Sequence, residues 1–262
     1  MDDGQETFIS HLIELRDRLL RALAAVLIVF LCLTPWAGRV YDFLAQPMMA
    51  NLPSGTKMIA TGVVTPFMVP LKVTLLAAFV IALPMILYQA WAFIAPGLYK
   101  HEKRFALPLV VGSTLLFLLG MAFCYYFVFG TVFRFIAHFA PASITPAPDI
   151  EQYLNFVMTM FLAFGVTFEV PVVVVLLVKF GIVSLDKLKD LRPYAIVGAF
   201  IVAAVVTPPD VSSQLMLAIP MCLLFELGLL LARFVAKPQV QGADEREALP
   251  GTIGEQDSGA DR

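Results

Sequence analysis

Apolar stretches alternate with short polar segments along most of this chain. Six such stretches lie near residues 19–36, 67–93, 105–129, 153–178, 193–206 and 215–232. A helix needs roughly 20 apolar residues to cross a hydrocarbon core about 30 Å thick, and several of the stretches are close to that length. The pattern predicts an all-α integral membrane protein with six transmembrane helices, and hence an even number of crossings.

Composition supports this prediction, since 60% of the residues are hydrophobic and the mean hydropathy is +0.84. The net charge of −2 gives no reason to expect a nucleic-acid partner, and we expect none. The acidic residues gather largely after Lys237, where Gly, Glu and Asp are frequent. Residues 233–262 are therefore predicted to form a disordered tail.

Lysine and arginine flank the stretches unevenly, with twelve on one side of the predicted membrane and four on the other. The twelve are Arg16, Arg18, Arg21, Lys100, Lys103, Arg104, Lys179, Lys187, Lys189, Arg192, Arg233 and Lys237; the four are Arg39, Lys57, Lys72 and Arg134. The positive-inside rule then predicts that both termini are cytoplasmic. The residues before the first stretch are acidic and no small-residue cleavage site follows it, so we expect this stretch to be retained.

The predicted domains follow from these patterns. Residues 1–18 form a cytoplasmic amphipathic helix, with Phe8, Leu12 and Leu15 on one face. Residues 19–232 form the membrane domain. Its first outer loop is predicted to carry a short helix over residues 38–49, suited to lie along the membrane interface.

The shape of the membrane domain is indicated by its prolines and by one short stretch. Prolines within or beside the stretches bend or end helices, so the six helices are predicted to form a curved bundle. Residues 193–206 would span only about 21 Å as a helix. Either the bilayer thins there or neighbouring helices shield this span from lipid.

Two acidic residues lie within the predicted spans. Glu169 has no basic residue within a helical turn. An ionised carboxylate at membrane depth is costly, so Glu169 either faces a wet cavity used in function or makes a hydrogen bond between helices. Glu226 lies near the end of the sixth stretch, where pairing with Arg233 is the simplest expectation. Cys32, Cys124 and Cys222 are interpreted as apolar fillers.

Two further carboxylates lie on the predicted cytoplasmic side. Glu14 has Arg18 four positions later, which allows an ion pair along the helix worth a few tenths of a kcal/mol. Glu102 lies among basic residues in HEKRF, which lacks the second histidine of H-E-x-x-H. We therefore expect no zinc site here and no cofactor elsewhere.

Four segments taken in order resemble the TatC family, the polytopic core of the twin-arginine translocase. They are HLIELRDRLL, WAFIAPGLYKHEKR, LNFVMTMFLAFGVTFEVPV and RPYAIVGAFIVAAVVTPPDVSSQLMLAIPMCLLFE. The resemblance extends from about Ser10 to Arg233, and its segments agree in order and spacing. It implies a protein of the bacterial cytoplasmic (inner) membrane that is a signal-peptide receptor and not an enzyme. Such proteins recognise paired arginines on folded cargo, assemble with the single-span proteins TatA and TatB, and export the cargo using the proton motive force.

The resemblance also implies residue roles. Signal-peptide binding falls on Glu14, Arg16, Phe93, Pro96 and Glu102; partner docking falls on Thr207 and Gln214; Asp210 is an outer acidic position between those two. The chemistry is reasonable because carboxylates engage guanidinium groups bidentately. The apolar part of the signal would lie in the concavity of the bundle with Glu169 at its polar floor, and several copies of the chain would share one receptor complex.

Two other classes of membrane protein share some of these sequence features. A proton-coupled secondary transporter is the alternative, because it would also place a carboxylate in the membrane, although no internal repeat of the spans is visible. An intramembrane protease is disfavoured, because Asp is absent from all six stretches and both H-E-x-x-H and G-x-S-x-G are missing.

Overall fold

A computed structural model describes residues 3–49, 58–94, 103–139, 147–207 and 211–235 of the chain. These residues are almost entirely helical. The elements are α1 (Asp3–Leu33), the 3₁₀ turn η1 (Thr34–Trp36), α2 (Ala37–Met49), α3 (Thr65–Ile94), α5 (Lys103–Phe123), the π-helical η2 (Cys124–Val128), α6 (Phe129–Phe139), α7 (Ile150–Phe168), α8 (Val170–Lys179), α9 (Leu185–Asp190), α10 (Arg192–Val206) and α11 (Val211–Val235).

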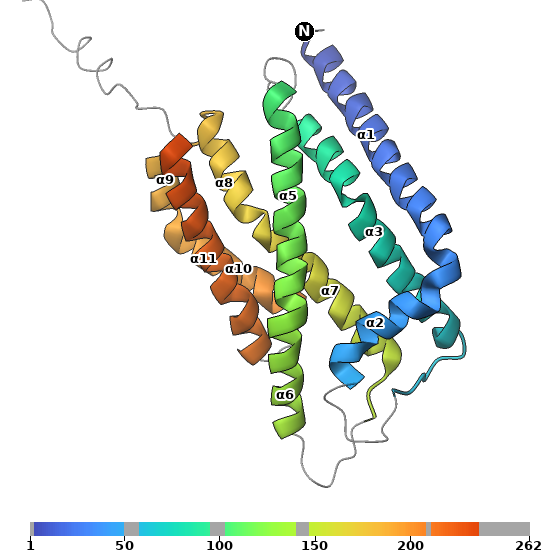
Figure 1. The fold of residues 1–262 in the computed structure, drawn as a ribbon. Helices are drawn as coiled ribbons and strands as arrows, with labels where there is room; N and C mark the ends of the chain where they lie inside the picture. Colours follow the sequence, from blue (N-terminus) through green and yellow to red (C-terminus); the bar gives the residue numbers. More distant parts are fainter. Residues whose placement is uncertain (1–2, 50–57, 95–102, 140–146, 208–210, 236–262) are drawn as a thin grey trace, which may run out of the picture.

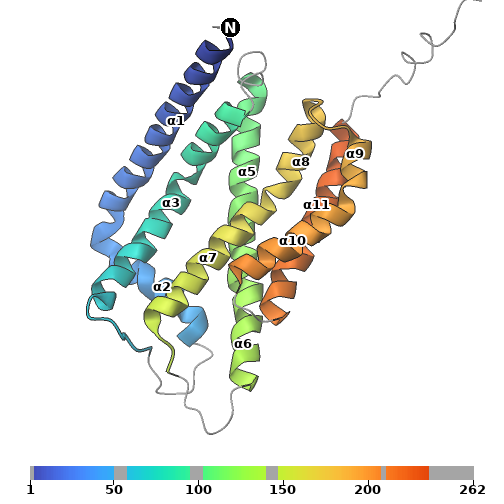
Figure 2. The ribbon, with the colours of Figure 1, turned by 180° about the vertical axis from the view of Figure 1, so that it is seen from behind.

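The long helices run up and down between two ends of the molecule (Figures 1 and 2). α1 begins and α11 finishes at one end, which we call the terminal end. α2, the start of α3 and the start of α7 lie at the other, which we call the α2 end. α10 turns back only part of the way, and α11 returns from there to the terminal end (Figure 1). Because the start of α1 and the finish of α11 lie at the same end, the described helices agree with an even number of crossings.

Five helical segments are long and apolar enough to cross a membrane: His11–Gln46, Thr65–Ile94, Leu107–Arg134, Ile150–Lys179 and Ser213–Phe234. α10 is also apolar, but its 15 residues span only about 22 Å. The prediction of a six-helix membrane bundle with a short fifth span is therefore confirmed. The predicted amphipathic helix 1–18 and the first span are one continuous helix, α1.

Two of the predicted spans are interrupted. The fourth divides at Glu169 into α7 and α8, because Pro171 has no N–H to donate to the Thr167 carbonyl four positions earlier. The third continues past the predicted boundary at residue 129 as the rod α5, η2 and α6. Its π-helical section carries two buried residues, Cys124 and Val128. Sections of this kind are uncommon and often lie near functional sites.

The main hydrophobic core lies where α3, α6, α7 and α11 meet. Its fully buried side chains include Val73, Phe129, Phe164 and Leu217. The Phe129 ring lies 5.2 Å from the Phe161 ring, centroid to centroid, in an edge-on arrangement that aromatic pairs prefer. A smaller cluster joins α8, α9 and α11 near the terminal end.

The predicted short helix in the first loop is present as α2. Leu44 is buried against the core, and its backbone carbonyl accepts a hydrogen bond of 3.0 Å from the Tyr153 hydroxyl of α7. Phe43, by contrast, remains 58% exposed. α2 is thus attached to the bundle by its apolar side at the α2 end.

Polar side chains at the α2 end join the segment before α3 to the start of α7. Asp149 caps α7 by accepting bonds from the amides of Glu151 and Gln152, and it also accepts a bond of 2.6 Å from the Thr61 hydroxyl. The Thr61 hydroxyl, followed by the Gln152 amide, holds the pKa of Asp149 below its usual range. Because the pKa of Asp149 is lowered in the folded state, its ionised carboxylate stabilises the fold at neutral pH. This contribution to the free energy of unfolding is lost as the pH falls through the lowered pKa.

A close helix crossing leads to a stability prediction. A Cβ added at Gly120 would lie 2.5 Å from the Phe164 carbonyl oxygen, whereas a Cβ at Gly112 would meet nothing within 4 Å. Both glycines belong to α5. Because a backbone oxygen cannot yield as a flexible side chain can, Gly120→Ala should destabilise the protein by about 1 to 3 kcal/mol. Gly112→Ala is the matched control and should be neutral or slightly stabilising.

The measurement is the thermal unfolding midpoint of the purified full-length protein in mild detergent. Equal midpoints for the two variants would contradict the close contact between α5 and α7.

Candidate functional site

The first part of the site lies at the terminal end, where α1 packs along α3. The His11 ring of α1 stacks on the Phe93 ring of α3, with centroids 4.4 Å apart and planes 20° from parallel. Glu14 follows His11 by three positions, so it lies on the same side of α1. The structure therefore places Glu14 one helical turn from the residue that stacks on Phe93.

Glu14 already has a cationic partner. The Arg18 guanidinium donates to the Glu14 carboxylate, with a distance of 2.9 Å from Nε to Oε1. Arg18 also reaches α3, where its Nη1 lies 3.5 Å from Oε1 of the buried Gln89. The Glu14 side chain nevertheless remains 42% exposed. The carboxylate is thus held in place on α3 and is still reachable from outside.

Arg16 lies apart from this cluster. Residues two positions apart on a helix do not face each other, and Arg16 pairs with its neighbour Asp17 at 2.9 Å. Its side chain is 67% exposed. Pro96 and Glu102, the other two residues expected to bind signals, lie outside the described residues.

The sequence interpretation missed three residues of this cluster: His11, Asp17 and Gln89. Asp17 lines a polar hollow of about 360 Å³ together with Ile13, Glu14, Arg18 and Arg21. The helical spacing of three from His11 to Glu14, and again from Glu14 to Asp17, could have placed His11 and Asp17 near Glu14 on α1. Gln89 belongs to α3 and had no such signal.

Glu169 forms the second part of the site, at the break between α7 and α8. The residue is only 7% exposed, and its two carboxylate oxygens have no hydrogen-bond partner among the described residues. The Ser113 hydroxyl of α5 lies near this carboxyl without meeting the geometry of a hydrogen bond. Ser113 in turn accepts a bond of 3.0 Å from the indole N–H of Trp91 on α3.

Glu226 does not pair with Arg233, and that expectation was wrong. Its Oε2 lies 2.8 Å from Nη2 of Arg192, the first residue of α10. Glu226 and Arg233 are separated by two turns of one helix, whereas the packing of α10 beside α11 brings Arg192 directly to the carboxylate.

The third part of the site lies where α10 meets α11. The buried Thr207 hydroxyl donates to the Ala203 carbonyl at 2.8 Å, and the Gln214 amide nitrogen donates to the Phe200 carbonyl at 3.3 Å. The amide oxygen of Gln214 is an acceptor that this second bond does not use. Asp210 lies outside the described residues.

Two apolar grooves flank these helices. One, of about 480 Å³, lies between the α5–η2–α6 rod and α11. Its lining includes Phe127, Leu215 and Ile219, so it begins beside Gln214.

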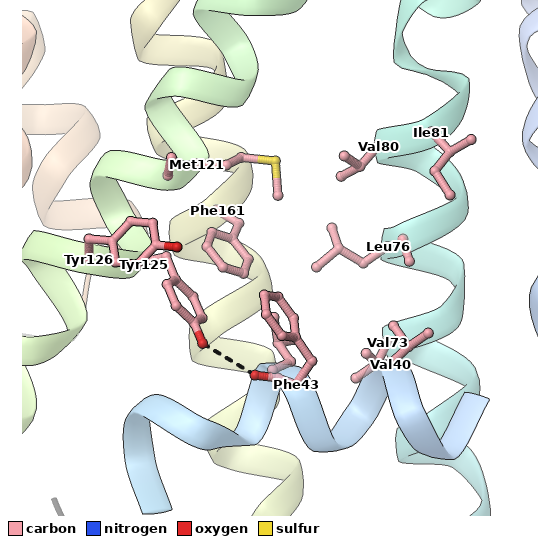
Figure 3. Close-up of a pocket in the computed structure, with 13 residues that line it drawn as sticks. Val40, Phe43, Val73, Leu76, Val80, Ile81, Met121, Tyr125, Tyr126 and Phe161 are labelled. Carbon is pink, nitrogen blue, oxygen red and sulfur yellow. Dashed lines mark hydrogen bonds between the residues drawn. The ribbon is translucent and has the colours of Figure 1, made fainter. Parts of the chain in front are cut away.

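The other groove, of about 370 Å³, lies between α2, α3, the α5–η2 rod and α7. Figure 3 shows Leu76 and Val80 of α3 facing Met121 and Phe161 across it. The Tyr125 hydroxyl at its edge donates to the Phe43 carbonyl at 3.4 Å (Figure 3).

Glu169 does not line this second groove. It lies eight residues beyond Phe161 in the chain, or about 12 Å along the helix axis. The expectation that Glu169 forms the polar floor of an apolar concavity therefore does not describe the groove in Figure 3.

Comparisons with known proteins agree on one family. Residues 10–220 match the family model "Sec-independent protein translocase protein (TatC)". The chain is 51% identical over 247 residues to the Sec-independent protein translocase protein TatC of Halothiobacillus neapolitanus, covering 94% of this chain and 68% of the relative. It is also 51% identical over 232 residues to the TatC protein of Escherichia coli K12, covering 88% and 90% of the two chains.

A solved structure gives the same result. The fold is similar to a crystal structure of the twin arginine translocase receptor TatC, with a TM-score of 0.77 and 38% sequence identity. The match covers 86% of this chain and 99% of the crystallised one.

Proposed function

Because this chain belongs to the TatC family of Sec-independent protein translocases, we propose that it receives twin-arginine signal peptides and forms the membrane core of the translocase. The observation that carries the receptor role is the 42% exposed Glu14 carboxylate, held by Arg18 one helical turn from His11, which stacks on Phe93. We propose no bond-making chemistry for the chain. Its work is to bind, orient and assemble.

Glu14 is suited to exchange one guanidinium for another. Its pair with Arg18 is an i,i+4 pair at the surface, of a kind usually worth less than about 1 kcal/mol. An arginine of a signal peptide can therefore replace Arg18 at small cost, while Arg18 keeps its contact with Gln89. Glu102 is proposed as a second carboxylate acceptor, and Phe93 and Pro96 as apolar contacts.

The proposal also implies a cellular location, a cargo and partner proteins. The terminal end faces the cytoplasm of a bacterial cell, in agreement with the excess of Lys and Arg beside the spans at that end. Folded cargo with a paired-arginine signal approaches there, and export across the inner membrane uses the proton motive force. TatA and TatB are the proposed single-span partners, in a complex with more than one copy of this chain.

The first functional prediction tests recognition by Glu14. Glu14→Gln keeps the shape but removes the charge, so it should weaken binding of a paired-arginine peptide about tenfold, since hydrogen bonds to charged groups contribute roughly 1.5 to 3 kcal/mol. Glu14→Asp should retain part of the affinity. Glu102→Lys adds two positive charges to a basic loop and should abolish binding.

Binding is measured with a fluorescent signal peptide and the full-length protein in lipid nanodiscs. Asp186→Asn is the matched control, because Asp186 is an exposed carboxylate on α9 that pairs with Lys189 at 2.8 Å. A peptide with two lysines should bind the parent weakly. Parent-like affinity of the Glu14 and Glu102 variants for the arginine peptide would refute the proposed receptor site.

Glu169 is proposed to act in export after the signal has bound. Glu169→Ala should leave the protein inserted and able to bind signals, while export of a reporter protein falls. Glu169→Gln should be milder if a neutral group that forms hydrogen bonds is sufficient. Loss of both variants from the membrane fraction would instead indicate a purely structural role.

Gln214 and the groove beside it are proposed to dock a single-span partner helix. A polar side chain of that helix could donate to the free amide oxygen of Gln214, and leaving such a group unpaired costs roughly 1 to 3 kcal/mol. Gln214→Leu should therefore reduce co-purification of the partners without changing signal binding. Thr207→Val should have a smaller effect, because the Thr207 hydroxyl is buried and bonded within its own helix. Unchanged co-purification of both variants would remove this docking site.

A further inference from the structure

A buried hydrogen bond joins two helices beside Glu169. The Trp91 indole N–H of α3 donates to the Ser113 hydroxyl oxygen of α5 at 3.0 Å. Both side chains are buried, Trp91 at 5% and Ser113 at 0% exposure. An indole N–H is a donor only, so the direction of this bond is unambiguous and Ser113 must be the acceptor.

The Ser113 proton is therefore available to another group. A serine in a helix often donates its proton to the carbonyl four residues earlier, as the adjacent Thr114 does to Val110 at 2.7 Å. Ser113 makes no such bond among the described residues, although Leu109 is one of them. The hydroxyl lies near the Glu169 carboxyl, whose oxygens also lack a partner in the described part of the chain.

We propose that Trp91 and Ser113 are positioning residues for Glu169: the indole fixes the Ser113 hydroxyl so that its single proton is directed at the carboxylate. When Glu169 is ionised, Ser113 donates to it; when Glu169 is protonated, it can donate to the remaining lone pair of Ser113. Ser113, held by Trp91, thus provides a hydrogen-bond partner for both the ionised and the protonated form of Glu169. This inference deepens the proposed role of Glu169 in export and rests on it.

Other titratable groups lie on the elements around Glu169. On α8, Lys179 is ten residues, or about 15 Å, further along the chain. On α11, Glu226 pairs with Arg192. The remaining groups on the surrounding elements are Lys72 and Tyr88 of α3, Lys103 and Arg104 of α5, Cys124, Tyr125 and Tyr126 of η2, Glu151 and Tyr153 of α7, and Cys222 and Arg233 of α11.

The experiment measures modification of Glu169 by dicyclohexylcarbodiimide, an apolar reagent that reacts with protonated carboxyl groups. The purified full-length protein is labelled in nanodiscs over a range of pH, and mass spectrometry quantifies the Glu169 peptide. Removing a donor to the carboxylate favours the protonated form, so in Ser113→Ala the labelling curve should move to higher pH by about one unit. Trp91→Phe should move it in the same direction by less.

Two controls separate positioning from packing. If Trp91 acts through Ser113, the double variant should match Ser113→Ala alone, whereas independent packing effects would add. Val110→Ala opens space in the same buried cluster without removing a hydrogen bond, so it should change the height of the curve and not its position. Three outcomes would overturn the inference. The labelling curve of Ser113→Ala could match that of the parent, the curve of Val110→Ala could shift as far as that of Ser113→Ala, or the curve of the double variant could shift further than that of Ser113→Ala. Labelling requires no signal peptide, partner protein or export. A failed labelling prediction is therefore distinguishable from failure of the proposed function.

Discussion

The absence of water at the depth of the hydrocarbon core is the constraint on which the rest of this structure depends. Each backbone N–H and C=O there must find a partner within the protein, which is why the described spans are helices. Interruptions are tolerated only where protein covers them. The π-helical turn carries the buried Cys124 and Val128, and the break between α7 and α8 lies at the buried residues Phe168, Glu169 and Pro171.

The same constraint sorts the polar side chains by depth. Two ion pairs join charged groups of neighbouring helices: Lys72 with Glu151 at 2.7 Å, and Arg192 with Glu226 at 2.8 Å. Within the bundle, the Trp91 indole N–H finds its acceptor in the Ser113 hydroxyl oxygen. Glu169 departs from this arrangement, since a buried carboxyl without a partner destabilises the fold unless its surroundings compensate. Such a departure from the pattern is typical of a functional position.

Much of the fold could be predicted from the sequence, because the lengths of the apolar stretches and the positions of prolines determine where helices can span the membrane, and both are visible in the residue order. The short fifth span, the α2 helix and an even number of crossings follow directly from residue order. The division at Glu169 was harder to predict, because prolines within other helices here, such as Pro70 and Pro84 in α3, do not end them. Whether a proline bends or breaks a helix depends on what surrounds the freed carbonyl, and that is a matter of packing.

The site was predictable as a set of residues but not as a set of contacts. Glu14 and Phe93 were named from the family resemblance, yet their proximity depends on the packing of α1 against α3. The expectation that Glu226 pairs with Arg233 was wrong for the same reason: a partner on the same helix is visible in the sequence, whereas Arg192 lies on a neighbouring helix. Gln89, Trp91 and Ser113 carried no sequence signal of their own.

One short section of α3 connects the receptor site with the intramembrane carboxyl. Gln89 contacts Arg18, Trp91 contacts Ser113, and Phe93 stacks on His11. These three residues fall within about 6 Å of helix rise. Coupling between two sites requires an element that both of them contact and that has more than one arrangement. The last turns of α3 meet the first requirement, because the side chain that supports Glu169 and the ring beside Glu14 are carried by the same stretch of helix. A displacement of that stretch on signal binding would therefore act on both sites together.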